Sequence, residues 1–149
     1  MSEQTSSTNE LILQAHYLAS DVSNIYDNLW QLNINEAVNK MLAMTKDIAD
    51  IVGNISPTAK TLSNSIDLTN AQEEIIKKAN EVNHAQGFER FPAALSLAET
   101  LFGDSAIALE LVAGTLLISG NFKASAEVAA IGANAFKIRK KLVYSTGCR

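Results

Sequence analysis

One pair of residues has a spacing that is used in metal chemistry. Glu81 and His84 are three residues apart and form an E-x-x-H pair, which a helix places on one face. Carboxylate-bridged di-iron bundles need two such motifs and two further glutamates on facing helices. The second histidine, His16, has Leu13 three residues before it, so the second motif is absent. We therefore interpret the pair as part of a solvated helix surface and predict no metal and no cofactor.

Residues for nucleophilic or acid–base catalysis do not converge in the sequence. The single cysteine, Cys148, lies next to the last residue, where no fixed neighbour is expected to lower the pKa of its thiol. Most of the sixteen carboxylates fall on outer helical positions. Glu110 is the exception, and we expect it to form a structural ion pair or to lie at an exposed edge. The sequence predicts no catalytic residue, and thus a protein that is not an enzyme.

The positive charges are concentrated near the C-terminus. Residues 1–122 contain six Lys or Arg against fifteen Asp or Glu, whereas residues 123–149 contain six against one. The densest group is Lys137, Arg139, Lys140 and Lys141, where cations oppose the dipole of a helix end. Nucleic-acid binding needs a broad positive face with stacking aromatics, and the acidic remainder would repel a polyanion. We therefore expect no nucleic-acid partner.

The elements that carry these residues are predicted to be helices throughout. In the first helix, apolar residues recur at alternating spacings of four and three, the seam typical of an amphipathic or coiled-coil helix, at Leu11, Ala15, Leu18, Val22, Ile25, Leu29 and Leu32. Thr8 or Asn9 is its expected N-cap. A second seam begins at Ile34 and continues to Ile66, which predicts an antiparallel helical hairpin. Gly53 and Pro57 predict a break within this seam, with a kink as the alternative.

The rest of the chain predicts four further helices. One opens at a capping box over residues 69–72 and ends at Gly87; the next covers 93–102 and ends at Gly103. Asp104 is then expected to cap a helix over 105–119, and the last helix covers 121–144. The predicted fold class is all-α, an elongated bundle of about six helices with an N-terminal antiparallel hairpin. We predict a flexible polar tail at 1–9, a single domain at 10–145 and a flexible C-terminus at 146–149.

The last helix has two apolar strips rather than one. Val128, Ile131, Ala135, Ile138 and Leu142 form the first strip, and the second, rotated away from it, contains Phe122, Ala126, Ala129, Ala133, Phe136 and Val143. Either the other helices surround this helix completely, or one strip is a contact surface. The candidate interface residues are Phe122, Ala126, Ala129, Ala130, Ala133, Phe136, Lys137, Arg139, Lys140 and Lys141.

These features favour a non-enzymatic interaction or self-assembly protein whose partner is itself or another protein. A second hypothesis is a membrane-active protein, toxin- or holin-like, that releases residues 93–142 as an amphipathic hairpin. Residues 106–118 are too short to span a membrane, which needs roughly 20 apolar residues. A third hypothesis is a bundle that binds a small ligand beside Trp30, Phe88, Phe91 or Phe102. A cytoplasmic location is expected, or export without a cleaved signal peptide.

Overall fold

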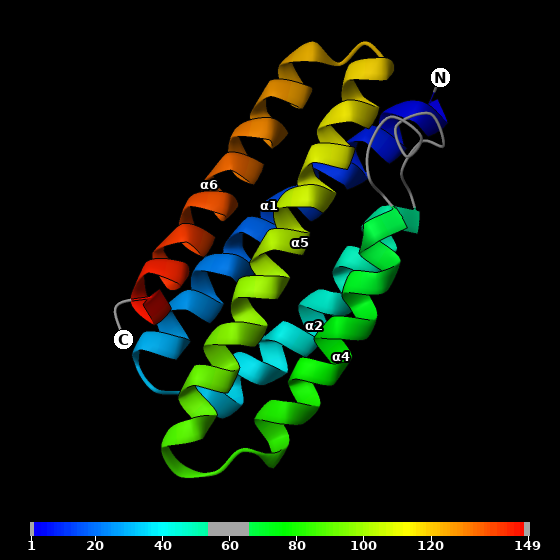
Figure 1. Ribbon diagram of the computed structural model, residues 1–149. Coiled ribbons are helices and arrows are strands. Elements are labelled where there is room, and N and C mark those ends of the chain that lie inside the picture. The colour runs from blue at the N-terminus through cyan, green and yellow to red at the C-terminus, as the bar shows by residue number, and fades with distance from the viewer. Residues whose placement is uncertain (1, 54–65, 148–149) are drawn as a thin grey trace.

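The protein is an elongated bundle of helices. The computed structural model describes residues 2–53 and 66–147. Within these residues there are five α-helices, a short 3-10 helix and no strand: α1 (Ser2–Trp30), α2 (Ile34–Gly53), α4 (Ile66–His84), η1 (Gly87–Glu89), α5 (Arg90–Ile118) and α6 (Phe122–Gly147). Figure 1 shows α4, α5 and α6 in front of α1 and α2. The predicted all-α class is confirmed.

The N-terminal hairpin forms as predicted. The seam of α1 is buried from Leu11 to Leu29, and Leu32 lies in the turn with a φ of 63°, in the left-handed region. The amides of Leu32 and Asn33 donate to carbonyls of the last turn of α1, and these bonds close the helix. The predicted N-cap is wrong, because α1 begins at Ser2 and Asn9 therefore lies inside the helix.

The connection from α2 to α4 lies partly outside the described residues. α2 ends at Gly53, and the predicted break or kink at Pro57 falls within 54–65, which the structure does not describe. α4 begins at Ile66, so the helix is already under way at the predicted capping box of residues 69–72, and that prediction is wrong. The left-handed Gly87, with a φ of 62°, separates α4 from α5.

The predicted break at Gly103 is wrong. α5 is one continuous helix of 29 residues, so five helices are described where about six were expected, and Asp104 lies inside a helix instead of capping one. A glycine inside a helix costs only about 1 kcal/mol relative to alanine, which packing readily offsets. At Gly103 the absent side chain leaves room for Arg139 of α6, because a Cβ atom there would lie 3.1 Å from the Arg139 Nε atom.

α5 is the central helix of the bundle. It packs against α1, α2, α4 and α6. Its fully buried side chains include Leu97, Leu101, Phe102 and Leu109. A helix covered by neighbours on several sides is apolar over most of its circumference, and this is the pattern of α5.

By length and composition alone, η1 and α5 together are long and apolar enough to cross a membrane. The segment Gly87–Ile118 has a mean hydropathy of 1.7 in its most apolar window, of which 61% is buried inside the bundle. The apolar stretch identified in the sequence, thirteen residues at 106–118, is therefore shorter than the apolar helix, because Gly103 does not interrupt α5. The core helix of a globular protein passes the same test.

α6 packs closely along α5 and contacts α1. Gly120, with a φ of 87°, makes the turn between α5 and α6, as the sequence predicted. The buried Ser125 hydroxyl donates to the Ala113 carbonyl of α5 at 2.7 Å. A Cβ atom at Gly132 would lie 3.2 Å from the Leu109 Cβ atom, so the two backbones are close at that level. The first apolar strip of α6, including Val128, Ala135 and Leu142, faces this contact.

Candidate functional site: the exposed face of α6

The second apolar strip of α6 is exposed. Phe122 and Phe136 are 68% and 42% exposed, and between them four alanines lie at the surface: Ala126, Ala129, Ala130 and Ala133. The other helices thus cover only one of the two strips, and the interpretation of α6 as a completely surrounded helix is wrong for its described side chains. Val143 of the same strip lies among the side chains that the structure does not describe.

A shallow groove follows this strip between α5 and α6. Its volume is about 520 Å³, and it is lined by Ala106, Glu110, Ala113, Ala129, Gly132, Ala133, Phe136, Lys137 and Lys140. Five of the predicted interface residues therefore line one groove. Small side chains on both helices leave backbone close to the surface, so that a partner helix can approach closely.

The basic residues of α6 differ in their surroundings. Lys137 and Lys140 are exposed at the groove, and the Lys140 Nζ atom lies 5.3 Å from the centre of the Phe136 ring. Lys141 is also exposed. Arg139 is half-buried and turned towards α5, where its Nε–H donates to the Glu99 carbonyl at 3.2 Å. Arg139 was predicted as an interface residue, but its described contacts join α6 to α5 of the same chain.

A second hollow, on α1 and α2, is acidic. It has a volume of about 410 Å³ and is lined by Gln14, Tyr17, Asp21 and Asp47. Burial and the neighbouring Asp47 raise the pKa of Asp21, which Lys40 partly opposes, and burial and Asp50 raise the pKa of Asp47. The two carboxylates therefore repel each other across the helix pair. A cation placed between them would relieve that repulsion.

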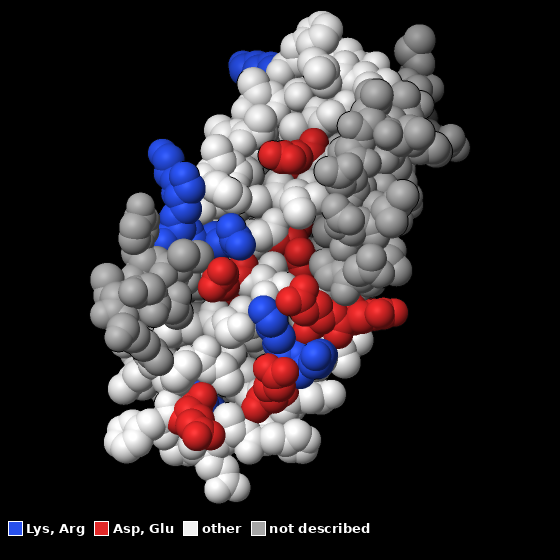
Figure 2. Space-filling view, in the orientation of Figure 1, with Lys and Arg blue, Asp and Glu red and all other residues white. Residues whose placement is uncertain are grey.

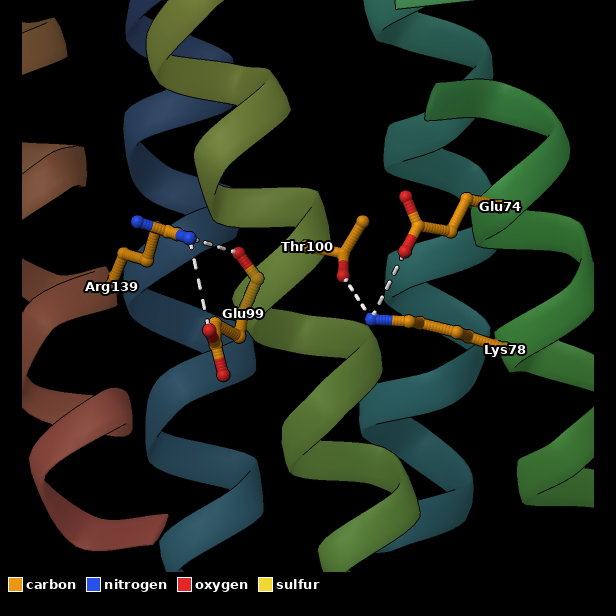
Figure 3. Close-up of polar contacts among 5 residues, drawn as sticks. All are labelled: Glu74, Lys78, Glu99, Thr100 and Arg139. Atoms are coloured by element: carbon orange, nitrogen blue, oxygen red, sulfur yellow. Dashed lines mark hydrogen bonds and ion pairs between the residues drawn. The ribbon is translucent and has the colours of Figure 1, made fainter. Parts of the chain in front are cut away.

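A third hollow, about 470 Å³ in volume, joins α4, α5 and α6 and is lined by more polar than apolar residues. Figure 3 shows its two ionic contacts. The Lys78 Nζ atom donates to the Thr100 hydroxyl at 2.6 Å and lies 3.5 Å from a Glu74 carboxylate oxygen. The guanidinium of Arg139 lies 3.7 Å from a Glu99 carboxylate oxygen. Each cation lining this hollow thus has one carboxylate partner.

Asp104 lines the same hollow and is only 8% exposed. Its Oδ2 atom is buried and has no hydrogen-bond partner among the described residues. Burial and then the Glu74 carboxylate raise the pKa of Asp104 to about 6, although Arg139 and Lys78 lower it. The sequence could have pointed to this hollow, because Glu99, Gly103, Ala106 and Glu110 share one face of an uninterrupted helix. The predicted break at Gly103 concealed that face.

The remaining candidate residues do not form a shared site. Glu81 and His84 are both exposed on α4, and no three acidic, histidine or cysteine side chains in the described parts of the chain are grouped to hold a metal. Glu110 lies at an exposed edge, one of the two environments predicted for it. Cys148 lies outside the described residues.

The four aromatic residues of the small-ligand hypothesis do not surround one cavity. Phe88 is 98% exposed and Phe102 is fully buried. Trp30 and Phe91 contact each other, with ring centres 6.2 Å apart. No family model, no curated protein and no solved structure matches this chain.

Proposed function

We propose that this chain is a non-enzymatic self-assembling protein whose exposed α6 face binds the α1–α2 surface of a neighbouring copy. The observation that carries the proposal is the row of exposed alanines on α6 between the exposed Phe122 and Phe136 rings. Burying apolar surface stabilises a contact by roughly 25 cal/mol per Å², and a contiguous apolar strip on a small protein is typical of an interaction site.

Charge supports a second copy as the partner. Lys137 and Lys140 stand at the α6 groove, and the hollow on α1 and α2 contains the mutually repelling Asp21 and Asp47. Figure 2 shows Lys and Arg along the α6 side of this face, whereas Asp and Glu dominate over α5 and α4. Lysines that enter the acidic hollow of a neighbour would neutralise its carboxylates and fix the register of the contact.

Apolar groups are available on the receiving surface too. Leu13 and Tyr17 are 52% and 59% exposed and lie one helical turn apart on α1, and Tyr17 lines the acidic hollow. Because the two contacting surfaces are different, the contact is heterologous. Repetition of such a contact produces a ring when the rotation closes and a filament when it does not.

The test introduces charge into the apolar strip. We expect Ala129→Glu together with Ala133→Glu to abolish self-association while the fold is kept, because both positions are exposed in the subunit. Light scattering coupled to size exclusion, over concentrations from low micromolar to near-millimolar, measures the mass. The matched control is Asn80→Glu with Asn83→Glu, two exposed positions on α4, which should assemble like the parent chain. A parent chain that stays monomeric at every concentration would contradict the proposal.

A second candidate function is membrane insertion of the α5–α6 hairpin. It is supported by the length and apolar composition of Gly87–Ile118 and by the cations of α6, which would meet anionic lipid. Insertion requires the hairpin to leave α1, α2 and α4. Dye release from anionic vesicles between acidic and neutral pH tests it, and the absence of release at every pH would remove this candidate.

A further inference from the structure

The hollow between α4, α5 and α6 has more negative than positive groups around it. Four carboxylates line it, from Glu74, Glu99, Asp104 and Glu110, against the two cations of Lys78 and Arg139. Lys78 pairs with Glu74 and Arg139 with Glu99. The other two carboxylates, Asp104 and Glu110, form no ion pair within the described parts of the chain.

Asp104 distinguishes this hollow from an ordinary acidic surface. The residue is only 8% exposed, it lines the hollow, and its buried Oδ2 atom has no hydrogen-bond donor among the described residues. A buried acceptor without a partner destabilises the fold, and more so when it is charged. With a pKa of about 6 the carboxyl group is largely ionised at neutral pH. A cationic ligand would supply both the missing hydrogen-bond donor and a compensating charge.

We propose that this hollow binds an aliphatic polyamine, with one ammonium group at the Asp104 carboxylate and a second at Glu110. The two carboxylates are six residues apart on α5, which is about 9 Å along the helix axis, so several methylene groups must separate the two ammonium groups. Apolar side chains are present for that alkyl chain, because Ala106, Ile107 and Phe136 also line the hollow.

The described residues favour an organic cation over a metal ion. No three acidic, histidine or cysteine side chains among them are close enough to share a metal, so a compact dication would find too few oxygen ligands. An ammonium group needs only one or two acceptors and offers several N–H donors. Charge-assisted hydrogen bonds of this kind are about twice as strong as neutral ones.

The test is isothermal titration calorimetry of the full chain with spermidine at low ionic strength. We expect saturable binding, with n-butylamine binding more weakly because it carries a single ammonium group. Asp104→Asn should weaken spermidine binding at least about tenfold, and Glu110→Gln should weaken it less because Glu110 is exposed. The matched control is Glu81→Gln, an exposed carboxylate on α4 that should leave the affinity unchanged.

Three results would overturn this proposal. They are the absence of saturable heat with spermidine, equal binding by the parent chain and the Asp104→Asn variant, or equal binding of Mg²⁺ at matched ionic strength. Circular dichroism and a melting curve of each variant establish that it is folded. The measurement is made at a concentration where the parent chain is monomeric, so its outcome is independent of self-assembly.

Discussion

At position 104 a carboxyl group lies inside a helix whose neighbouring residues are largely buried. The Asp104 side chain is in the middle of α5, flanked by the buried Ser105 and Phe102. Ser105 satisfies its hydroxyl locally by donating to the Leu101 carbonyl at 2.8 Å, but the Asp104 Oδ2 atom has no partner among the described residues. Burial disfavours the charged form of the acid, which is why its pKa is raised to about 6.

Asp104 should make the stability of the fold depend on pH. Because the pKa rises from 3.8 in the unfolded chain to about 6 in the folded one, the folded state binds the proton more tightly. The stabilisation from this group is therefore complete below about pH 4 and is lost as the pH rises through 6. We expect Asp104→Asn to stabilise the protein at pH 7.5 by about 1–2 kcal/mol more than at pH 4.5, after allowance for screening by solvent and the nearby cations.

Urea unfolding at the two pH values measures this difference. The raised pKa values of Asp21 and Asp47 affect parent and variant equally, so they cancel in the comparison. Glu81→Gln, at an exposed position, is the control and should show no such difference. An Asp104→Asn effect that is the same at both pH values would show that the carboxyl group does not titrate in this range.

At the scale of the helices, α5 and α6 contain similar apolar residues but have different surroundings. α5 is covered by four other helices, whereas α6 contacts α5 and α1 and keeps its alanine strip at the surface. The close contact of the two helices depends on small residues of α6: Gly132 leaves room for Leu109 of α5, and Ser125 donates to the Ala113 carbonyl. A larger side chain at such a position would separate the helices.

Gly132 gives a direct test of that packing. A Cβ atom at this position would already be 3.2 Å from the Leu109 Cβ atom, so Gly132→Leu should force the helices apart and destabilise the fold by about 1–3 kcal/mol. Asn134→Leu places the same side chain at an exposed position of α6 outside the alanine strip and should change the free energy of unfolding by less than about 0.5 kcal/mol. Thermal or urea unfolding compares the two, and equal effects would contradict the close helix contact.

The molecule as a whole is electrically asymmetric. The described parts of α1 and α2 expose more carboxylates than lysines, and α6 contains five of the twelve Lys and Arg residues of the chain. Single surface ion pairs contribute only about 0–1 kcal/mol. Complementary surfaces nevertheless set the orientation of an association and make it sensitive to salt. If copies associate head to tail, reversing the charge of either surface alone should prevent assembly.

This prediction can be tested by charge reversal on both surfaces. Variant one contains Lys137→Glu and Lys140→Glu; variant two contains Asp21→Lys and Asp47→Lys. We expect each variant to be monomeric alone, because its two surfaces then repel, and the equimolar mixture to assemble as the parent chain does. Analytical ultracentrifugation measures the three samples. If neither charge reversal changes assembly, but the Ala129→Glu and Ala133→Glu pair abolishes it, α6 instead pairs with α6 of a second copy.

The residue pattern alone determined the helical class, the hairpin and the turns at Gly87 and Gly120, because apolar spacing and glycine conformation are local properties. It also identified the second apolar strip of α6. Only the tertiary structure decided that Gly103 lies within a helix. The glycine leaves room for the side chain of Arg139, which is 36 positions later in the sequence and packs against it from α6. The same holds for the hollow around Asp104: its charges come from three helices, and burial depends on which helices pack together. A sequence pattern shows which faces are apolar, whereas the packing of distant segments decides which of those faces are covered.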